Sequence, residues 1–289
     1  MQEPKSSPEK TWRLVVNAVF LLLPYRHQVR NRAHCVEPLP DAVFDQDSHL
    51  RSRRVRWLSV VSPTLNEIEN VEPLVRRLTE VLAALPHEIL IVDDDSQDQT
   101  WRRVEELAGS VPQLRLLRRF EKHGLGFAVM DGFAAASGDA VACIDSDLQH
   151  DPAILPQMVA ELERGAAAVV GCRYMPGGGT IGWTLLRRFE SFCATRLAQA
   201  CLGIRLRDPM SGFFVMWKDD FMRIRERIDG SGFKILLEIA AHLSPAAVRE
   251  VPYWFRPRQH GSSKLSSRVV LQYLGQLRRL RNSGCGAIR

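Results

Sequence analysis

Short strand-like runs alternate with helical patterns along residues 57–144, and this alternation restricts the fold more than any other feature. The strand-like runs, rich in β-branched and small apolar residues, are 57–62, 88–92, 114–117 and 139–144. The helical patterns between them cover 71–85, 100–107 and 126–136. Strands that alternate with helices predict a doubly wound, mostly parallel α/β sheet with flanking helices. Ligands of such sheets bind beyond the carboxyl ends of the strands.

The second half of the chain continues this pattern less regularly. We expect strands at 166–171, 213–217 and 248–255, and helices at 183–202 and 233–243. Three segments follow from the composition: an N-terminal extension at 1–56, an α/β domain at 57–263, and a C-terminal amphipathic basic helix with its tail at 264–289. A length of 289 residues is ample for a large core.

Two apolar segments raise the question of membrane contact. Leu14–Leu23 is ten residues long, whereas a membrane-spanning helix needs about 20. It predicts either a packed or membrane-surface segment or part of a loosely ordered extension, and no transmembrane helix is expected. The last helix carries an apolar face between basic residues, which is typical of a helix on an anionic membrane or of one packed on the core. That face consists of Leu265, Val269, Tyr273, Leu274, Leu277 and Leu280.

The net charge indicates the kind of partner, and the cysteine pattern indicates the cellular compartment. The net charge is +6, and the arginines cluster, which favours anionic partners such as phosphates, nucleic acid or an acidic membrane surface. The six cysteines are scattered without a Cys-x-x-Cys pair. This spacing argues against a zinc site and against a disulfide framework, and it fits a reducing, cytosolic compartment.

Polar side chains follow the run 139–144 where the predicted strand ends. Asp145 and Asp147 are one residue apart, so strand alternation predicts that both leave the same side while Ser146 points away. Gln149 follows in step. Oxygen ligands at this spacing suit Mg²⁺ or Mn²⁺, which also take phosphate oxygens from a substrate. For this pattern alone, an acidic turn before a helix that starts at Asp151 is the alternative.

Three strand ends bear polar residues that we expect to converge at one edge of the sheet: 63–67, 93–96 and 145–149. Competing nucleotide motifs fit poorly. Gly124-Leu-Gly126 lacks a third glycine, because Val129 occupies that position, and there is no Gly-x-x-x-x-Gly-Lys-Ser/Thr sequence. A nicotinamide enzyme and a P-loop nucleotidase are therefore disfavoured. Without either motif, a bound nucleotide must be held by the acidic strand ends through a metal ion.

Six short motifs occur in a recognisable order. They are Pro-Thr-Leu-Asn-Glu (63–67), Val-Asp-Asp-Asp-Ser (92–96), Asp-Ser-Asp-Leu-Gln-His (145–150), Gly-Cys-Arg-Tyr (171–174), Asp-Pro-Met-Ser-Gly-Phe (208–213) and Arg-x-x-Gly-x-Ser-Lys (258–264). With these motifs the chain resembles the polyprenyl-phosphate glycosyltransferases among the family 2 inverting glycosyltransferases. Dolichyl-phosphate mannose synthases are the nearest type. The resemblance covers about residues 57–275, and it implies the Rossmann-like GT-A fold.

The resemblance also implies residue roles. Nucleotide binding is implied for Pro63, Leu65, Glu67, Val92, Asp94, Asp145 and Ser146. Metal binding, of Mg²⁺ or Mn²⁺, is implied for Asp145, Asp147 and Gln149. Binding of donor and acceptor phosphates is implied for Arg173, Arg187, Ser191, Arg258 and Lys264. Asp145, Asp147 and Arg173 would be the catalytic residues. Some relatives have tyrosine at position 65, which puts base stacking by Leu65 in doubt, and His150 is expected to be structural.

The implied reaction is inverting transfer of one sugar from a nucleotide-sugar to a polyprenyl or dolichyl phosphate. Mannose from GDP-mannose is the first expectation, and a UDP-linked glucose, N-acetylhexosamine or amino-sugar is the alternative. A phosphate monoester is already nucleophilic near pH 7, so we infer that positioning and electrostatics dominate over a strong general base. The enzyme would associate peripherally with the cytoplasmic face of a membrane.

Two other classes of function are compatible with parts of the sequence. A nucleic-acid-binding protein would explain the arginine clusters. However, the clusters lack interleaved aromatic residues, and acidic strand ends repel a polyanion, so no nucleic-acid partner is expected. A catalytically silent membrane-surface binder would share the fold. However, the expected metal ligands Asp145, Asp147 and Gln149 are all present, which argues against a silent protein.

Overall fold

The computed structural model describes residues 53–121, 123–232, 234–259 and 267–283. The strands of the main sheet are β1 (Leu58–Thr64), β2 (His87–Asp93), β3 (Leu114–Arg118), β4 (Ala140–Cys143), β5 (Ala168–Cys172), β7 (Phe214–Trp217) and β8 (Val248–Pro252). A second, two-stranded sheet contains β6 (Gly179–Thr180) and β9 (Trp254–Phe255). The predicted strand 248–255 is therefore two short strands in different sheets, separated by Tyr253.

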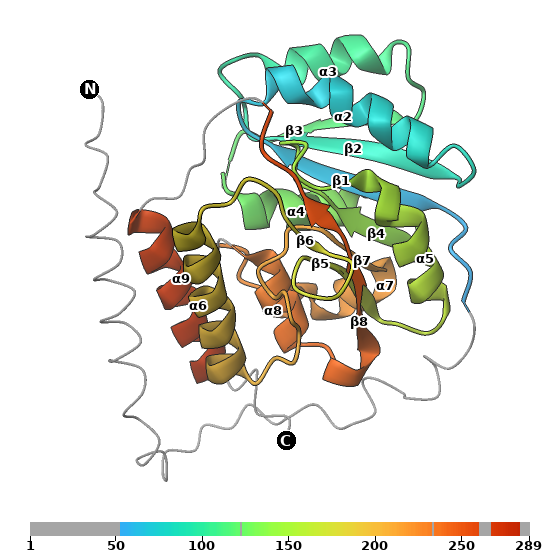
Figure 1. Ribbon diagram of the computed structural model, residues 1–289. Coiled ribbons are helices and arrows are strands. Elements are labelled where there is room, and N and C mark those ends of the chain that lie inside the picture. The colour runs from blue at the N-terminus through green and yellow to red at the C-terminus, as the bar shows by residue number, and fades with distance from the viewer. Residues whose placement is uncertain (1–52, 122, 233, 260–266, 284–289) are drawn as a thin grey trace, which may run out of the picture.

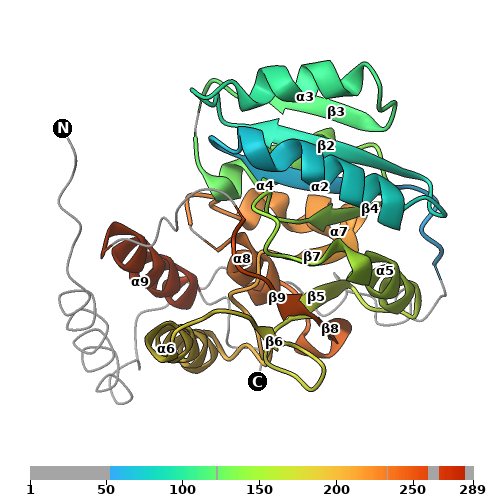
Figure 2. The same cartoon turned by 45° about the horizontal axis from the view of Figure 1, so that its top comes forward.

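Helices cover both faces of the seven-stranded sheet (Figures 1 and 2). They are α2 (Ile68–Val81), α3 (Thr100–Ala108), α4 (Leu125–Ala135), α5 (Leu155–Glu163), α6 (Leu185–Leu202), α7 (Lys218–Ile224), α8 (Ile235–Ala241) and α9 (Ser267–Asn282), with short 3₁₀ helices at Pro152–Ile154, Arg225–Arg227 and Pro245–Ala247. Buried residues of α2, α3 and α5 pack on one face, and those of α4, α7 and α8 pack on the other.

The strand order β3-β2-β1-β4-β7-β5-β8 confirms the predicted doubly wound, mostly parallel sheet. β7 is the exception, because it runs antiparallel to β4 and β5. The chain leaves the carboxyl end of β5 and passes through α6. It returns to the same edge, where Asp208 accepts hydrogen bonds from Arg173 just beyond β5. A strand that starts from this edge must run in the opposite direction.

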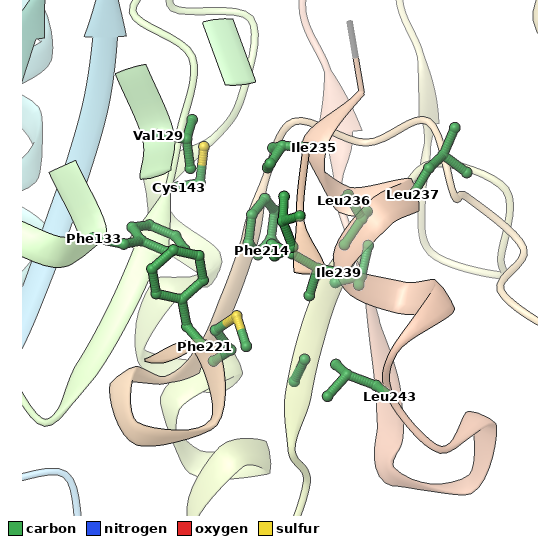
Figure 3. Packing of buried hydrophobic residues seen from close by; sticks show 14 of the residues in the cluster. Val129, Phe133, Cys143, Phe214, Phe221, Ile235, Leu236, Leu237, Ile239 and Leu243 are labelled. Atoms are coloured by element: carbon green, nitrogen blue, oxygen red, sulfur yellow. The ribbon is translucent and has the colours of Figure 1, made fainter. Parts of the chain in front are cut away.

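The larger part of the core lies between the sheet and α4, α7 and α8. Phe133 packs edge to face on Phe221 and Phe214, with ring centroids 5.1 and 5.8 Å apart (Figure 3). Gly132 brings α4 close to the sheet, since a Cβ atom there would collide with Val61 and Val92. The side chain of Val92 is fully buried in the core, and the nucleotide contact expected of this residue stays a prediction.

The last helix, α9, packs beside α6 in both views (Figures 1 and 2). The Tyr273 hydroxyl donates a 2.6 Å hydrogen bond to the Ala194 carbonyl, and Tyr273, Leu277 and Leu280 are buried in the core. Of the two interpretations of its apolar face, the core-packed helix is the one observed for these residues. Leu265 and residues 1–52 of the predicted extension lie outside the described residues.

Within the described parts of the chain, no helix combines the length and the apolar composition that crossing a bilayer requires.

Candidate active site

The ends of β1 and β2 are tied together by a network around the buried Asp93. Its carboxylate accepts hydrogen bonds from the Thr64 hydroxyl at 2.9 Å and from the Ser96 hydroxyl and backbone N–H at 2.6 and 2.8 Å. The Ser96 hydroxyl oxygen in turn accepts a hydrogen bond from the Asn66 N–H at 2.9 Å. This network holds the turn after β1 against the turn after β2, so two of the three predicted polar strand ends converge.

Asp94 points away from that network and forms a buried ion pair with Arg119. Its other carboxylate oxygen accepts a 2.7 Å hydrogen bond from the Gly124 N–H, just before α4. Both oxygens of Asp94 therefore have partners within the protein. Leu65, by contrast, is 43% exposed at the same edge. Nucleotide contacts of Pro63, Leu65, Glu67 and Asp94 remain predictions.

The third polar strand end departs from the expected geometry. β4 ends at Cys143, and the chain turns through residues 146–148, with Leu148 at a φ of +59°. Strand alternation therefore does not orient Asp145 and Asp147, which face different partners. Asp147 accepts a 3.1 Å hydrogen bond from the Gln149 N–H, and Ser146 is buried.

Arg258 joins the third strand end to the first. Its guanidinium donates a 2.7 Å hydrogen bond to Asp147 Oδ2 and lies 3.6 Å from Glu67 Oε1. Glu67 and Asp147 thus face the same arginine, although 80 residues of sequence separate them. The convergence of the strand ends after β1 and β4 is confirmed, with the loop after β9 as the link between them.

The pKa of Asp145 is lower than its usual value because of the groups around it. Burial raises its pKa, but the hydrogen bond and the charge of His150 lower it. The charges of Lys234 and Arg258 lower it further, and the resulting pKa is about 2. A permanently charged carboxylate at a strand end is the property that a cation ligand requires.

Arg173 is held by Asp208 through a buried two-point ion pair. The Nε and one terminal nitrogen of Arg173 each donate a 2.7 Å hydrogen bond to Asp208, whose Oδ2 also accepts from the Arg173 N–H at 3.0 Å. Burial lowers the pKa of Arg173, but Asp208 raises it well above its usual value. Asp208 thus occupies the Nε and one terminal nitrogen of the Arg173 guanidinium. The other terminal nitrogen is the group with which Arg173 would contact a phosphate.

Arg187 and Ser191 lie on α6, on the side that faces Arg173. The Arg187 guanidinium lies 4.4 Å from the centre of the Trp183 ring, and the Ser191 hydroxyl is 2.6 Å from that of Tyr174. Burial lowers the pKa of Arg187, and the charges of Arg173 and Arg258 lower it further. Three arginines are therefore close enough to repel one another, which favours an anion between them. Lys264 lies outside the described residues.

Comparison with known proteins gives the family of this chain. The family described as glycosyl transferase family 2 matches residues 59–225. The dolichol-phosphate mannosyltransferase of Saccharomyces cerevisiae is 39% identical over 232 residues, which cover 77% of this chain and 86% of the yeast protein. This chain belongs to glycosyl transferase family 2. The dolichol-phosphate mannosyltransferase of Pyrococcus furiosus is 38% identical over 225 residues, which cover 77% of this chain and 63% of that longer protein.

Solved structures support the GT-A fold of this family 2 glycosyltransferase. A glucosyl-3-phosphoglycerate synthase from Mycobacterium tuberculosis, in complex with Mn²⁺, UDP-glucose and phosphoglyceric acid, matches with a TM-score of 0.55 at 22% identity. The match covers 77% of this chain and 80% of that one. At this identity the likeness concerns the fold alone, and it agrees with the sheet order and helical layers described above.

The donor atoms of this family 2 enzyme fit a hard divalent cation. Within the described residues no group of three or more His, Cys, Asp and Glu side chains is placed to hold a metal ion. Asp145 and Asp147 supply carboxylate oxygens. The Gln149 amide nitrogen donates to the Arg256 carbonyl at 2.9 Å, so its oxygen, the atom that could bind a cation, lies on the opposite side of the group. Such sparse oxygen sets suit Mg²⁺ or Mn²⁺, which keep water and phosphate ligands.

The structure adds a residue that the sequence interpretation treated as structural. His150 is 3% exposed, and its Nε2 lies 3.0 Å from Asp145 Oδ2 while its Nδ1 lies 2.8 Å from the Tyr253 hydroxyl. The ring packs between Phe213, Tyr253 and Phe255. His150 therefore orients a predicted cation ligand. Tyr253 and Asp208 were not predicted as site residues, because their partners are distant in sequence. Asp208 opens the motif 208–213, which could have pointed to it.

Proposed function

We propose that this family 2 glycosyltransferase transfers mannose from GDP-mannose to dolichyl phosphate, or to another polyprenyl phosphate, with inversion at the anomeric carbon. The observation that carries the proposal is the pairing of opposite charges at one edge of the sheet. The carboxylates of Asp145 and Asp147 lie beside Arg258, and the charges of Arg173 and Arg187 act on the same place. The relatives named dolichol-phosphate mannosyltransferase support the choice of donor and acceptor.

The chemistry follows from these groups. The reaction breaks the bond between the anomeric carbon and the donor diphosphate, and a phosphate oxygen of the acceptor forms the new bond. A divalent cation held by Asp145, Asp147 and Gln149 would offset the negative charge of the diphosphate. Arg173, Arg187 and Arg258 stabilise phosphate charge through directed N–H groups in a partly buried site. Since the acceptor phosphate is already charged, the protein mainly aligns the two substrates.

We also propose that α6 faces the lipid surface. Large apolar side chains of its first half are exposed: Leu185 at 83%, Leu186 at 47%, Phe189 at 47% and Phe192 at 52%. Exposed apolar groups flanked by arginines are typical of surfaces that enter the headgroup region of a membrane. Arg187 lies on the same helix and turns toward the site, so α6 would bring the lipid phosphate next to the arginines.

We place the reaction on the cytoplasmic face of the membrane. The cysteines of the described residues, Cys143, Cys172, Cys193 and Cys201, are free thiols. Free thiols are the ordinary state of cysteine in a reducing compartment. Protease protection of the enzyme in sealed microsomes tests this placement, since a cytoplasmic enzyme is digested without detergent and a lumenal one is protected.

A donor panel tests the reaction. The purified full-length protein is incubated with dolichyl phosphate in vesicles, Mn²⁺ and radiolabelled GDP-mannose, UDP-glucose or UDP-N-acetylglucosamine. We expect mannose in the organic phase from GDP-mannose alone, and loss of that label with EDTA. Label from a UDP-sugar instead would refute the proposed donor. If folded protein labels lipid from no donor, the proposed function is wrong.

A further inference from the structure

A buried amide connects the last helix to the edge of the active site. Gln276, in α9, is fully buried. Its Nε2 donates to the Lys234 carbonyl at 2.9 Å and to Glu238 Oε1 at 2.8 Å, and its Oε1 accepts from the Lys234 N–H at 3.3 Å. A residue 42 positions away thus holds both backbone groups of Lys234, which immediately precedes α8.

The segment before Lys234 is fixed against the start of α4. Gly230 has a φ of +70°, and its N–H donates to Glu238 Oε2 at 3.1 Å. A Cβ atom on Gly126 would collide with the carbonyl of Gly230, which shows how closely this loop approaches α4. Since α4 begins directly after the Gly124 N–H that binds Asp94, the loop lies at the carboxyl edge of the sheet.

The charge of Lys234 acts on the predicted cation ligands. Burial lowers the pKa of Lys234 and the charge of Arg173 lowers it further, while the carboxylates of Asp145, Asp208 and Asp147 oppose that shift. A partly buried ammonium group is costly unless anions compensate it. Placed among carboxylates and arginines that we assign to a diphosphate site, it is suited to hold a phosphate oxygen.

We propose that Lys234 binds a phosphate oxygen of a substrate in this site, and that Gln276 is the positioning residue that holds Lys234 there. The inference rests on the proposed function, because it assumes that the site accepts a nucleoside diphosphate or a lipid phosphate. Under this proposal, α9 positions a residue of the site and also packs on the core. Neither residue belongs to the six sequence motifs.

A double-mutant cycle tests the inference. The affinity for GDP with Mn²⁺ is measured by calorimetry for the full-length protein, Lys234→Met, Gln276→Leu and the double variant, and the KM for dolichyl phosphate is measured in parallel. We expect Lys234→Met to weaken GDP binding or to raise the KM for the lipid by roughly 10- to 100-fold, as for other hydrogen bonds to charged groups. The first result identifies the donor diphosphate as the ligand, and the second identifies the acceptor.

The coupling between the two changes separates positioning from general stability. If Gln276 acts through Lys234, Gln276→Leu weakens the same parameter in the wild-type background and has little further effect once Lys234 is Met. Tyr273→Phe is the matched control, because it removes a hydrogen bond of α9 to α6 and touches neither Lys234 nor Glu238. We expect this control to bind GDP as the wild type does.

Two results would overturn the inference. An unchanged GDP affinity together with an unchanged KM for the lipid in Lys234→Met would exclude a phosphate contact. If the fold-changes of Lys234→Met and Gln276→Leu simply multiply in the double variant, Gln276 does not act through Lys234. Failure of the proposed function gives a different result: the wild-type protein itself transfers no sugar to the lipid from any donor, whatever the effect of Lys234→Met on GDP affinity.

Discussion

The region from β1 through the turn after β4 and the region from β5 to α9 differ in how their charged side chains are paired. In the first, buried carboxylates are matched within the protein: Asp93 with Thr64 and Ser96, and Asp94 with Arg119. In the second, Asp208 matches Arg173, but Arg187 lies over an indole ring, and α6 exposes apolar side chains to solvent. The first region thus has the fixed geometry that the proposed nucleotide site would need. The second presents cations and apolar surface that suit a lipid phosphate.

Asp147→Asn tests the contribution of the first region and has the largest expected effect. It removes a charge from the predicted cation site, so we expect turnover to fall by roughly 100-fold or more, the scale of losing one preorganised electrostatic contact. Vesicle binding should not change. Asp95→Asn is the control, because Asp95 pairs with Arg118 at the same edge and is exposed. Equal turnover of Asp147→Asn and wild type would exclude the metal role.

The double variant Leu185→Ser, Phe192→Ser tests the second region. Each exposed side chain that enters a membrane contributes about 1.5–3 kcal/mol, so for two side chains we expect vesicle affinity to fall by about 100-fold or more in a flotation assay. GDP affinity should stay unchanged. Met222→Ser, which alters an exposed apolar residue of α7, is the control. A similar loss with Met222→Ser would show that α6 is not the membrane-facing element.

Tyr253→Phe tests how the second region supports the first. The tyrosine comes from the segment between β8 and β9, and its hydroxyl contacts His150, which contacts Asp145. Groups that orient metal ligands typically contribute 10- to 100-fold in metal affinity, so we expect about a tenfold weaker Mn²⁺ affinity, measured by electron paramagnetic resonance. Tyr273→Phe, with the same chemical change on α9, should leave it unaltered. Unchanged Mn²⁺ affinity in Tyr253→Phe would contradict the orienting role.

Glu88→Gln has the smallest expected effect on function and tests whether the first region is a structural frame. Burial raises the pKa of Glu88, but hydrogen bonds from Ser59 and Ser137 and the ion pair with Arg115 lower it more. Because its folded pKa lies below the usual 4.5, the stability it contributes is complete above that value and is lost as the pH falls.

We therefore expect Glu88→Gln to unfold more easily at pH 7, by about 1–3 kcal/mol, with a smaller dependence on pH below 4.5. Denaturant unfolding at pH 7 and pH 4 measures both. An acid sensitivity equal to that of the wild type would show that another group is responsible. Donor and lipid affinities at pH 7 should be unchanged, since Glu88 is remote from the strand ends that form the site.

Local patterns were sufficient to predict the regular part of the fold. Strands β1 and β2 lie where short apolar runs predict them, because strands buried on both faces need continuous apolar residues. The edge strand β3 also lies where it was predicted, although it is only partly buried. The order of the motifs indicated the family, and the strand ends indicated Glu67, Asp145 and Asp147 as neighbours. Alternation was the wrong argument for the last two, since β4 ends before them.

Tertiary structure alone decided which partners these residues have. Three contacts join residues from separate elements: Arg173 pairs with Asp208, His150 contacts Tyr253, and Gln276 hydrogen-bonds to the backbone of Lys234. Tertiary structure also decided what covers the apolar faces of the amphipathic helices. The pattern of α9 shows an apolar face but not what covers it, whereas packing buries that face and leaves Leu185 and Phe192 of α6 exposed. Sequence periodicity records which side of a helix is apolar, and only the folded chain determines whether protein or solvent meets that side.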